Sequence, residues 1–362
     1  MTCATAQPDR QHPADGRSGC ENSGSKIARM TCAPVVLLAF NRPHTVQRML
    51  ERFREAAIPR LFVAADGPRA GFANDPDRCR EVRELLDTGI DWDCDVVRIY
   101  RDRNLGCEGN TELTLDEVFS QIPAAIILDD DCLPDLSFFR FATELLEHYA
   151  EDERIMHIAG SNDQAPRELF GPSSYAFTAF GSNWGWATWA RAWQRHRSAF
   201  PRPHDATTVR VPYGPPPHRF MPQADSRTFT PARQDLVSAS ARRFFGDVAA
   251  ARDLSLSEWG QQWRLSMLNV GGLAITPAEH LIENIGFAPD STSSMPTRDM
   301  PAAAPLSFPL VHPSVVSVNP GVERVLERTL VRAVGRLART VRPRTPARLR
   351  EAARRVGSVL VR

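Results

Sequence analysis

The stretch "PAAIILDDDCLPDLSFF", Pro123–Phe139, joins an apolar run to three consecutive aspartates, Asp129, Asp130 and Asp131. A short apolar run bounded by polar residues is typical of a buried strand in a parallel sheet. Adjacent carboxylates repel one another unless a cation lies between them. A divalent cation such as Mg²⁺ or Mn²⁺ is the simplest candidate, because hard cations prefer carboxylate oxygens. The alternative is a solvated acidic turn that caps a following helix.

Other apolar runs in the first half of the chain also end in polar residues. "PVVLLAF" is followed by "NRP", and "RLFVAADGP", residues 60–68, ends in Asp-Gly-Pro. Helix-like segments follow at residues 44–58, 77–89 and 110–122, and "DVVRIYR", residues 95–101, is a fourth strand candidate. The alternation predicts an α/β fold with a mostly parallel central sheet.

Three polar strand ends should therefore meet at one edge of the sheet, where ligands bind in open α/β folds. They are "NRP", "DGP" and "DDD". The first strand is not followed by a GxGxxG pattern, which disfavours a dinucleotide site of the dehydrogenase type.

The second half of the chain is predicted to hold fewer regular elements. Residues 137–152 and 256–268 are helix-like, whereas "RIMHIAGSN" and "GGLAITP" are strand-like. We expect a disordered leader over residues 1–30, one catalytic domain over residues 31–300, and a Pro-rich linker with a basic helical tail over residues 301–362.

The tail is strongly basic, with 12 arginines against 3 glutamates over residues 321–362. Arg324, Arg328, Arg332 and Arg336 recur every four residues, opposite an aliphatic face. Such a basic amphipathic helix is typical of peripheral contact with an anionic membrane. The alternatives are a helix packed on the domain and a disordered tail.

The composition argues against several classes of protein and site. The formal net charge of the 362 residues is +1, so nothing indicates a nucleic-acid partner. The seven cysteines form no CxxC pair, which argues against a disulfide framework and a structural zinc site. The apolar run "APVVLLAF" is far shorter than the roughly 20 residues that a membrane-spanning helix needs. We expect a cytoplasmic protein, peripheral to the inner face of the membrane if the tail binds lipid.

The segment "AIILDDDCLPDLSFFRF" resembles the DXD-type metal motif of nucleotide-sugar glycosyltransferases with the Rossmann-like GT-A fold. The nearest likeness is to N-acetylglucosaminyltransferase I and to bacterial glycosyltransferase-like proteins associated with hemolysis. Five further segments resemble that family in the same order: "LLAFNRP", "VAADGP", "NLGCEGN", "WGWATWARAW" and "ENIGFAPDST". Together they span about residues 33–293.

The resemblance implies roles for individual residues. Asp131 would ligate a Mn²⁺ or Mg²⁺ ion, Asp130 would approach the donor ribose, and Asp129 would face the donor sugar. Asp66 would accept a hydrogen bond from the base, and Arg42 would lie near the nucleotide phosphates or base. Alternatives remain for two of them: a turn residue in the case of Asp66 and a surface arginine in the case of Arg42.

The tryptophan-rich segment divides between site and core. Gly185 and Trp186 are predicted to line the donor site, because "NWGW" suits a turn on which a sugar could stack. Trp193 is predicted to lie in the core, since large aromatic side chains dominate core area.

One departure concerns the catalytic base. An inverting transferase of this type needs a carboxylate that deprotonates the acceptor hydroxyl. The relatives place an aspartate directly after the tryptophan of the segment that resembles "EWGQQW", and this chain has Gly260 there. We therefore predict Glu258 as the catalytic base, with Asp253 as a second candidate. The late "STSS" also replaces a Thr-His pair of the relatives.

The sequence thus predicts a metal-dependent hexosyl- or N-acetylhexosaminyltransferase. It would use a nucleoside-diphosphate donor, UDP-linked by preference, and a glycan or lipid-linked acceptor in surface glycan synthesis. Two alternatives remain: a catalytically weakened sugar-nucleotide-binding protein of the same fold, and a nucleotidyltransferase. The latter usually carries a Gly-rich loop after its first strand, which "NRPHTV" lacks.

Overall fold

The computed structural model describes residues 32–199, 259–286 and 302–329. The predicted leader over residues 1–30 lies outside these ranges. So does most of the basic tail, including Arg332 and Arg336, and its contact with membrane stays a prediction. Within the described ranges, no helix has the length and apolar character needed to cross a bilayer.

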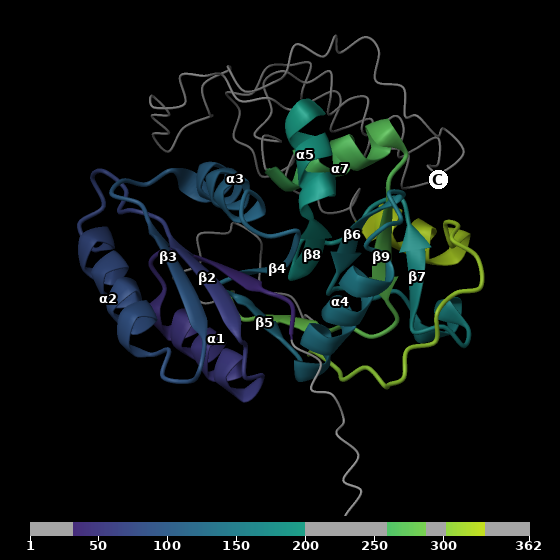
Figure 1. Cartoon of the computed structure of the whole chain (residues 1–362), viewed down its shortest axis with the longest axis horizontal. Coiled ribbons are helices and arrows are strands. Elements are labelled where there is room, and N and C mark those ends of the chain that lie inside the picture. The colour runs from purple at the N-terminus through teal and green to yellow at the C-terminus, as the bar shows by residue number, and fades with distance from the viewer. Residues whose placement is uncertain (1–31, 200–258, 287–301, 330–362) are drawn as a thin grey trace, which may run out of the picture. The chain divides into compact units, whose positions relative to one another are not determined.

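The centre of the protein is an eight-stranded sheet with the strand order β3-β2-β1-β4-β8-β6-β9-β7 (Figure 1). Its strands are β1 (Val35–Ala39), β2 (Arg60–Ala65), β3 (Asp95–Tyr100), β4 (Ala124–Asp129), β6 (Ile155–Ala159), β7 (Tyr175–Thr178), β8 (Trp186–Trp189) and β9 (Leu273–Pro277). A separate two-stranded antiparallel ribbon pairs β5 (Cys132–Pro134) with β10 (Ile282–Asn284).

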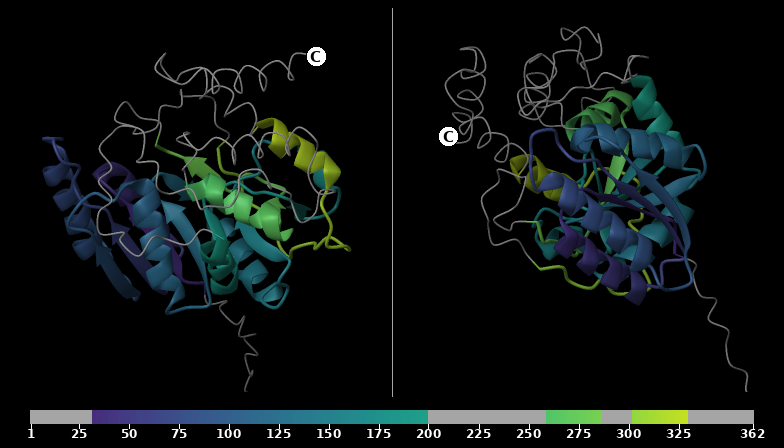
Figure 2. Two further views of the ribbon diagram at one scale, coloured as in Figure 1. Left: turned by 90° about the horizontal axis from the view of Figure 1, so that it is seen from above. Right: turned by 90° about the vertical axis from the view of Figure 1, so that its left-hand side faces the viewer.

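Helices cover both faces of the sheet (Figures 1 and 2). One face packs against α1 (Pro43–Glu55), α2 (Asp75–Thr88) and α4 (Leu136–His148). The other packs against α3 (Gly106–Phe119), α5 (Ala190–Ala199) and α7 (Trp259–Val270). A short 3-10 helix, η1 (Arg167–Phe170), lies between β6 and β7. These elements confirm the predicted α/β class with a mostly parallel central sheet.

The helices form where the sequence predicted, because their apolar residues recur on one side. In α1, the residues Val46, Met49, Leu50 and Phe53 are buried at three- and four-residue intervals. In β1, alternate residues point to opposite faces of the sheet. Val35 and Leu37 pack in the core on the side of α1 and α4, and Val36 and Leu38 pack in the core on the side of α3 and α7. A strand buried on both faces explains the unbroken apolar runs in the sequence.

The strand order creates a switch point between β1 and β4. From β1 the chain moves by way of α1 and α2 to β2 and β3 on one side, and then returns by way of α3 to β4 on the other. The carboxyl ends of β1 and β4 are thus adjacent, with no crossover covering the gap between them. Arg42 follows β1 and Asp129–Asp131 ends β4, so both fall at this point.

Two antiparallel strands were not predicted. β8 lies between β4 and β6 and runs opposite to both. It comes from the tryptophan-rich segment, whose aromatic content hides the alternation of a strand. β7 pairs antiparallel with β9 at the edge of the sheet.

Residues 302–329 pack on the domain. Leu306 and Leu310 enter the core beside α4, and the amide of Ser174 donates to the carbonyl of Val311 (2.8 Å). Residues 320–329 are helical, with Val322 and Leu326 buried and Arg324 and Arg328 exposed. The first turns of the predicted amphipathic tail therefore place their aliphatic face against protein.

Candidate functional site

The acidic triplet lies at the switch point because strand pairing places it there. Asp129 is paired with Leu38 in the β1–β4 register, and the amide of Asp130 donates to the carbonyl of Leu38 (2.9 Å). Arg42 follows the end of β1, and Pro43 then begins α1 with the fixed φ that suits the first helical position. The three carboxylates and the guanidinium therefore meet at neighbouring strand ends.

Arg42 is the cation between two of the three carboxylates. Its guanidinium pairs with the Asp130 carboxylate and, at 2.9 Å, with Oδ2 of Asp131. Asp130 also accepts from the amide of Phe40 (3.3 Å). Asp130 is buried, whereas the Asp131 side chain is 21% exposed, so Asp131 is the more accessible of the pair.

Asp129 has no ion pair among the residues that the structure describes. Burial, together with the charges of Asp131 and Asp130, raises its pKa to about 8, although Arg42 opposes the shift. The triplet thus holds more negative charge than one arginine neutralises. That excess is what a bound cation would relieve.

The donor set fits a hard divalent cation. Ligand atoms of Asp129, Asp131 and Cys132 lie within 4.8 Å of one another. Burial raises the pKa of the Cys132 thiol well above its usual range, so the sulfur stays protonated. The two carboxylates are then the ligands on offer, and they suit Mg²⁺ or Mn²⁺.

The ribbon of β5 and β10 closes one side of the triplet. The amide of Ile285 donates to the carbonyl of Asp131 (2.8 Å), which brings Gly286 against the carboxylate. A Cβ at Gly286 would lie 2.2 Å from Oδ2 of Asp131, so only glycine fits there. This glycine is the last residue of the second described range.

Asp66 follows β2, and its carboxylate is held by hydrogen bonds and not by Arg42. Its carboxylate accepts from the amides of Gly67 (2.8 Å), Leu105 (2.8 Å) and Gly106 (3.0 Å), and from Nδ2 of Asn104 (2.9 Å). Four donors occupy the acceptor positions of a carboxylate. Asp66 is buried and holds the start of α3, so we leave it out of the proposed donor site.

Gly185 and Trp186, both predicted to line the donor site, lie in different surroundings. Trp186 is 1% exposed, and its ring stacks on His157 and on Trp259, each at 5.2 Å between centroids. Trp186 and Trp193 are both core residues, as predicted for Trp193 only. Gly185 has φ +56°, and its carbonyl accepts from the amide of Gly160 (2.7 Å) at the edge of the sheet near the triplet.

Glu258, the predicted base, lies outside the described residues, as does Asp253. Gly260 is the second residue of α7. A Cβ there would lie 2.1 Å from Nδ2 of Asn183, so Asn183 occupies the space that a larger side chain at position 260 would need.

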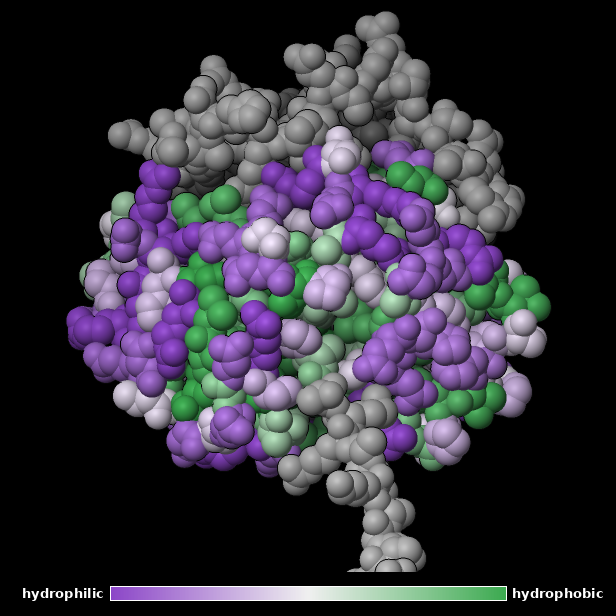
Figure 3. All heavy atoms as spheres, viewed as in Figure 1, coloured by the Kyte–Doolittle hydropathy of each residue, from purple (hydrophilic) through white to green (hydrophobic). Residues whose placement is uncertain are grey.

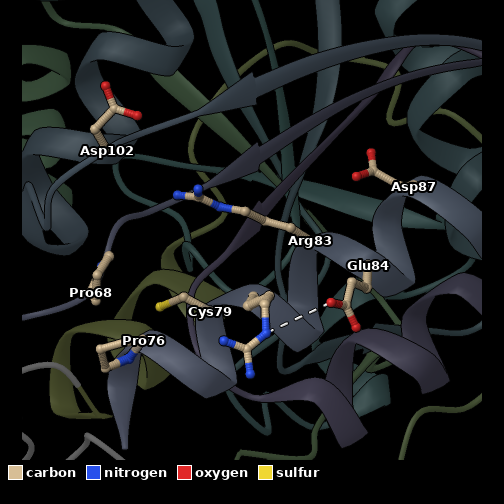
Figure 4. A pocket seen from close by; sticks show the side chains of 8 residues that line it. Pro68, Pro76, Cys79, Arg83, Glu84, Asp87 and Asp102 are labelled. Carbon is tan, nitrogen blue, oxygen red and sulfur yellow. Dashed lines mark ion pairs between the residues drawn. The ribbon is translucent and has the colours of Figure 1, made fainter. Parts of the chain in front are cut away.

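A hollow away from the triplet lies along α2, with a volume of about 410 Å³ (Figure 4). Its lining includes Pro68, Cys79, Arg83 and Asp102, and none of the residues predicted for the donor site. The face drawn in Figure 3 is mostly hydrophilic, with apolar residues gathered toward its middle. Among the described residues, the exposed large hydrophobic side chains are Phe72, Leu136, Val270, Val311 and Val315.

No protein-family model matches this chain, and no curated protein matches it. Among solved structures it is similar to a UDP-glucose pyrophosphorylase complexed with UDP-glucose, at 12% identity and a TM-score of 0.26. That match covers 47% of this chain and 81% of the other. A 4-diphosphocytidyl-2C-methyl-D-erythritol synthase from Anaerococcus prevotii DSM 20548 gives 9% identity and a TM-score of 0.28, with coverage of 48% and 81%. At such low identities and scores neither similarity bears on function, and the α/β architecture rests on the sheet itself.

Proposed function

We propose that this protein is a metal-dependent glycosyltransferase that takes a sugar from a nucleoside-diphosphate donor. The observation that carries the proposal is the acidic triplet at the switch point between β1 and β4, with Arg42 bridging Asp130 and Asp131. Ligands of open α/β sheets bind at this point. The resemblance of the triplet and five other segments to GT-A glycosyltransferases supports the same conclusion.

In this proposal Asp131 and Asp129 hold the divalent cation. When bound, the cation would neutralise charge on the diphosphate leaving group. Asp131 contributes the more accessible carboxylate, and Asp129 contributes a second carboxyl group that has no ion pair among the described residues. The Asp131 oxygen is confined between the Arg42 guanidinium and the backbone at Gly286, which limits its rotation.

Arg42 has a second part in the proposal. Its guanidinium already spans Asp130 and Asp131, so it lies within reach of any diphosphate carried to Asp131. With a cation bound at Asp131, the guanidinium N–H groups of Arg42 would donate to phosphate oxygens of the donor. Asp130, held by Arg42 and by the Phe40 amide, is then a fixed acceptor for a donor hydroxyl such as that of the ribose.

The test is a thermal-shift screen of the full chain with UDP-, GDP- and dTDP-sugars, each with and without MnCl₂, followed by calorimetric titration of any donor that stabilises the protein. We expect stabilisation by one donor class only when manganese is present. Asp131→Ala should reduce the manganese affinity by more than the 10–100-fold that losing an outer-shell partner costs.

Asp135→Asn is the matched control, because it removes the same charge four residues later. Asp135 caps α4 by accepting from the amide of Ser137 (2.8 Å), and asparagine caps equally well. A wild-type chain that binds no nucleotide sugar with manganese would contradict the proposal. A chain that instead makes a nucleotide sugar from a nucleoside triphosphate and a sugar phosphate would favour the nucleotidyltransferase alternative.

A further inference from the structure

A second group of polar side chains lies at the same edge of the sheet as the acidic triplet. We call it the β6 cluster and define it as Ser161, Asp163, Ser182, Asn183, Arg264 and His280. Ser161 and Asp163 follow the carboxyl end of β6, and Ser182 and Asn183 lead into β8. Arg264 comes from α7, and His280 follows β9. Separate stretches of the chain thus bring polar groups to one place.

The register of the sheet gives its distance from the triplet. Ile127 of β4 pairs with Trp186 of β8, and Trp186 pairs with Ala159 of β6. Asp129 and Ser161 each lie two residues beyond this level, on strands that run in the same direction. Neighbouring strands are about 4.8 Å apart, so the two groups are separated by about 10 Å across β8. A hexose bound at the triplet would span most of that gap.

Asp163 is held in place by its neighbours. The hydroxyl of Ser161 donates to Oδ1 of Asp163 (3.3 Å) and accepts from the Asp163 amide (3.2 Å). The backbone at Asp163 has φ +48°, in the left-handed region that aspartate tolerates better than most residues. The carboxylate is therefore fixed by a hydroxyl and a turn, and it forms no salt bridge among the residues that the structure describes.

Two opposing influences act on the Asp163 carboxyl. Burial raises its pKa above the usual range, against the charge of Arg264 and hydrogen bonds from the hydroxyls of Ser161 and Ser182. The Asp163 side chain is partly exposed, and the charge of Arg264 lowers its pKa more than the two hydroxyls do. Its pKa stays raised in spite of that charge, and a carboxylate with a raised pKa is the stronger base.

The cluster also contains buried polar atoms that have no partner among the described residues. They are Oδ1 of Asn183 and Nε2 of His280. His280 is 6% exposed, and its Nδ1 lies 3.2 Å from the Ser161 hydroxyl. In the tautomer in which Nδ1 donates to the Ser161 oxygen, Nε2 is an acceptor. Buried polar atoms without partners are costly, and a hydroxylated ligand would satisfy them.

Of the other carboxylates at this edge, Asp66, Asp130 and Asp131 already have partners within the protein, and Asp129, which has no ion pair among the described residues, is assigned to the cation in the proposal above. Four N–H groups hold Asp66, and Arg42 pairs with both Asp130 and Asp131. Building on the function proposed above, we infer that the β6 cluster binds the hydroxyl group of the acceptor and that Asp163 removes its proton.

The step balances without any additional reagent. The Asp163 carboxylate takes the hydroxyl proton, and the acceptor oxygen uses the freed electron pair to form a bond to the anomeric carbon of the donor sugar. The bond between that carbon and the diphosphate oxygen breaks, and its electrons leave with the nucleoside diphosphate. Asp163 then returns its proton to solvent.

The test uses water as the acceptor, so that the natural acceptor need not be known. Release of UDP from UDP-sugar in the presence of MnCl₂ is measured for the wild-type full chain and for Asp163→Asn. Asparagine keeps the shape and tolerates the positive φ, so the variant should fold. We expect UDP release to fall about 100-fold or more, as for loss of a general base. Donor affinity by calorimetry should not change.

Three further variants sharpen the result. Glu168→Gln removes the same charge from the exposed surface a few residues later and should release UDP at the wild-type rate. Ser161→Ala should give a smaller loss, about 10-fold, because Asp163 stays but loses its fixed hydroxyl partner. Glu258→Gln tests the rival base predicted from the sequence.

A pH series supplies a second readout. In the wild type, the rate should rise with pH as Asp163 ionises beside Arg264 and His280, and Asp163→Asn should lose that rise. Wild-type UDP release by Asp163→Asn, or a loss seen only with Glu258→Gln, would overturn the inference and leave the proposed function intact. A wild-type chain that binds the donor yet releases no UDP would also overturn it. Absence of donor binding in the wild type would remove the proposed function and the inference together.

Discussion

Asp66 and Asp131 begin from the same position in the fold and end in different environments. Each follows a parallel strand of the same sheet, at the same edge. Four N–H donors, three of them from the backbone, surround the Asp66 carboxylate. Asp131 shares one guanidinium with Asp130 and lies next to Asp129, which has no ion pair among the described residues. The hydrogen-bonding positions of the Asp66 carboxylate are filled within the protein, whereas Asp130 and Asp131 share one cation.

The residues directly after each strand account for the difference. Gly67 allows the backbone to pass against Arg103, since a Cβ at position 67 would lie 2.4 Å from a backbone carbon of that residue. That close approach brings the start of α3 onto the Asp66 carboxylate, where the helix N-terminus favours a negative charge. β4 is followed by two more aspartates instead. A carboxylate that its own backbone satisfies stabilises the fold, whereas carboxylates that share one cation can still attract a ligand.

Asp66→Ala should produce the largest change in stability. It removes four hydrogen bonds to a charged acceptor and leaves buried N–H groups unsatisfied, so we expect the free energy of unfolding to fall by about 4 kcal/mol. Urea unfolding monitored by tryptophan fluorescence measures it. Manganese affinity should stay at the wild-type value. Asp77→Ala, on the exposed side of α2, should change stability by no more than about 0.5 kcal/mol.

The same variant also tests whether Asp66 contacts the donor. If Asp66→Ala keeps wild-type stability and instead loses binding of the nucleotide sugar, then Asp66 contacts the base, as the family resemblance predicted. The four donors around Asp66 would in that case position its carboxylate for the base and would contribute little to stability.

Arg42→Ala should have the next largest effect, and its size should depend on metal. Without manganese, the buried Asp130 loses the cation that balances it, and we expect a loss of about 2–3 kcal/mol, somewhat less than for a fully buried pair. Manganese should restore part of that loss, because it can replace the missing charge. Arg48→Ala, on the exposed side of α1, is the control. Equal destabilisation with and without manganese would mean that the triplet does not bind the metal.

The sequence predicted the elements that local pattern determines. Strands β1, β2 and β4 are apolar runs buried on both faces, and α1 has its apolar residues on one side, so both can be found from periodicity. The meeting of Arg42 with the triplet followed from a general property of parallel sheets, namely that polar strand ends share an edge.

Long-range contacts determine the parts of the structure that the sequence could not predict. Residues 104–106 donate hydrogen bonds to the Asp66 carboxylate. Predicting these bonds would require knowing that α3 begins next to β2. The burial of Trp186 depends on β8 pairing between β4 and β6, which no local pattern indicates. The β6 cluster joins residues as far apart in the chain as Ser161 and His280. Asp163 carries no sequence signal beyond a polar residue after a strand.

Glu323 is another buried carboxylate, its second oxygen has no partner among the described residues, and its expected effect appears only at high pH. In the helix over residues 320–329 it is 5% exposed, and its Oε2 accepts from the amide of Ala179 (2.9 Å). Burial, with a smaller contribution from the charge of Glu327, raises its pKa to about 8. Its ordinary value is 4.5. The folded protein therefore binds a proton that the unfolded chain has released between these values, so the stability that this proton contributes is complete below pH 4.5 and is lost as the pH rises toward 8.

Glu323→Gln removes that titration and keeps an oxygen for the Ala179 amide. At pH 9 we expect the variant to be more stable than the wild type by at least about 1 kcal/mol, and this advantage should shrink as the pH falls to 5. Urea unfolding at pH 5, 7 and 9 measures the trend, and Glu168→Gln should show a difference that does not vary with pH. If Glu323→Gln is less stable than the wild type at pH 9, the ionised carboxylate has a donor that compensates its burial. The start of the tail would then be held to the domain by charge, in the way that Arg42 holds Asp130.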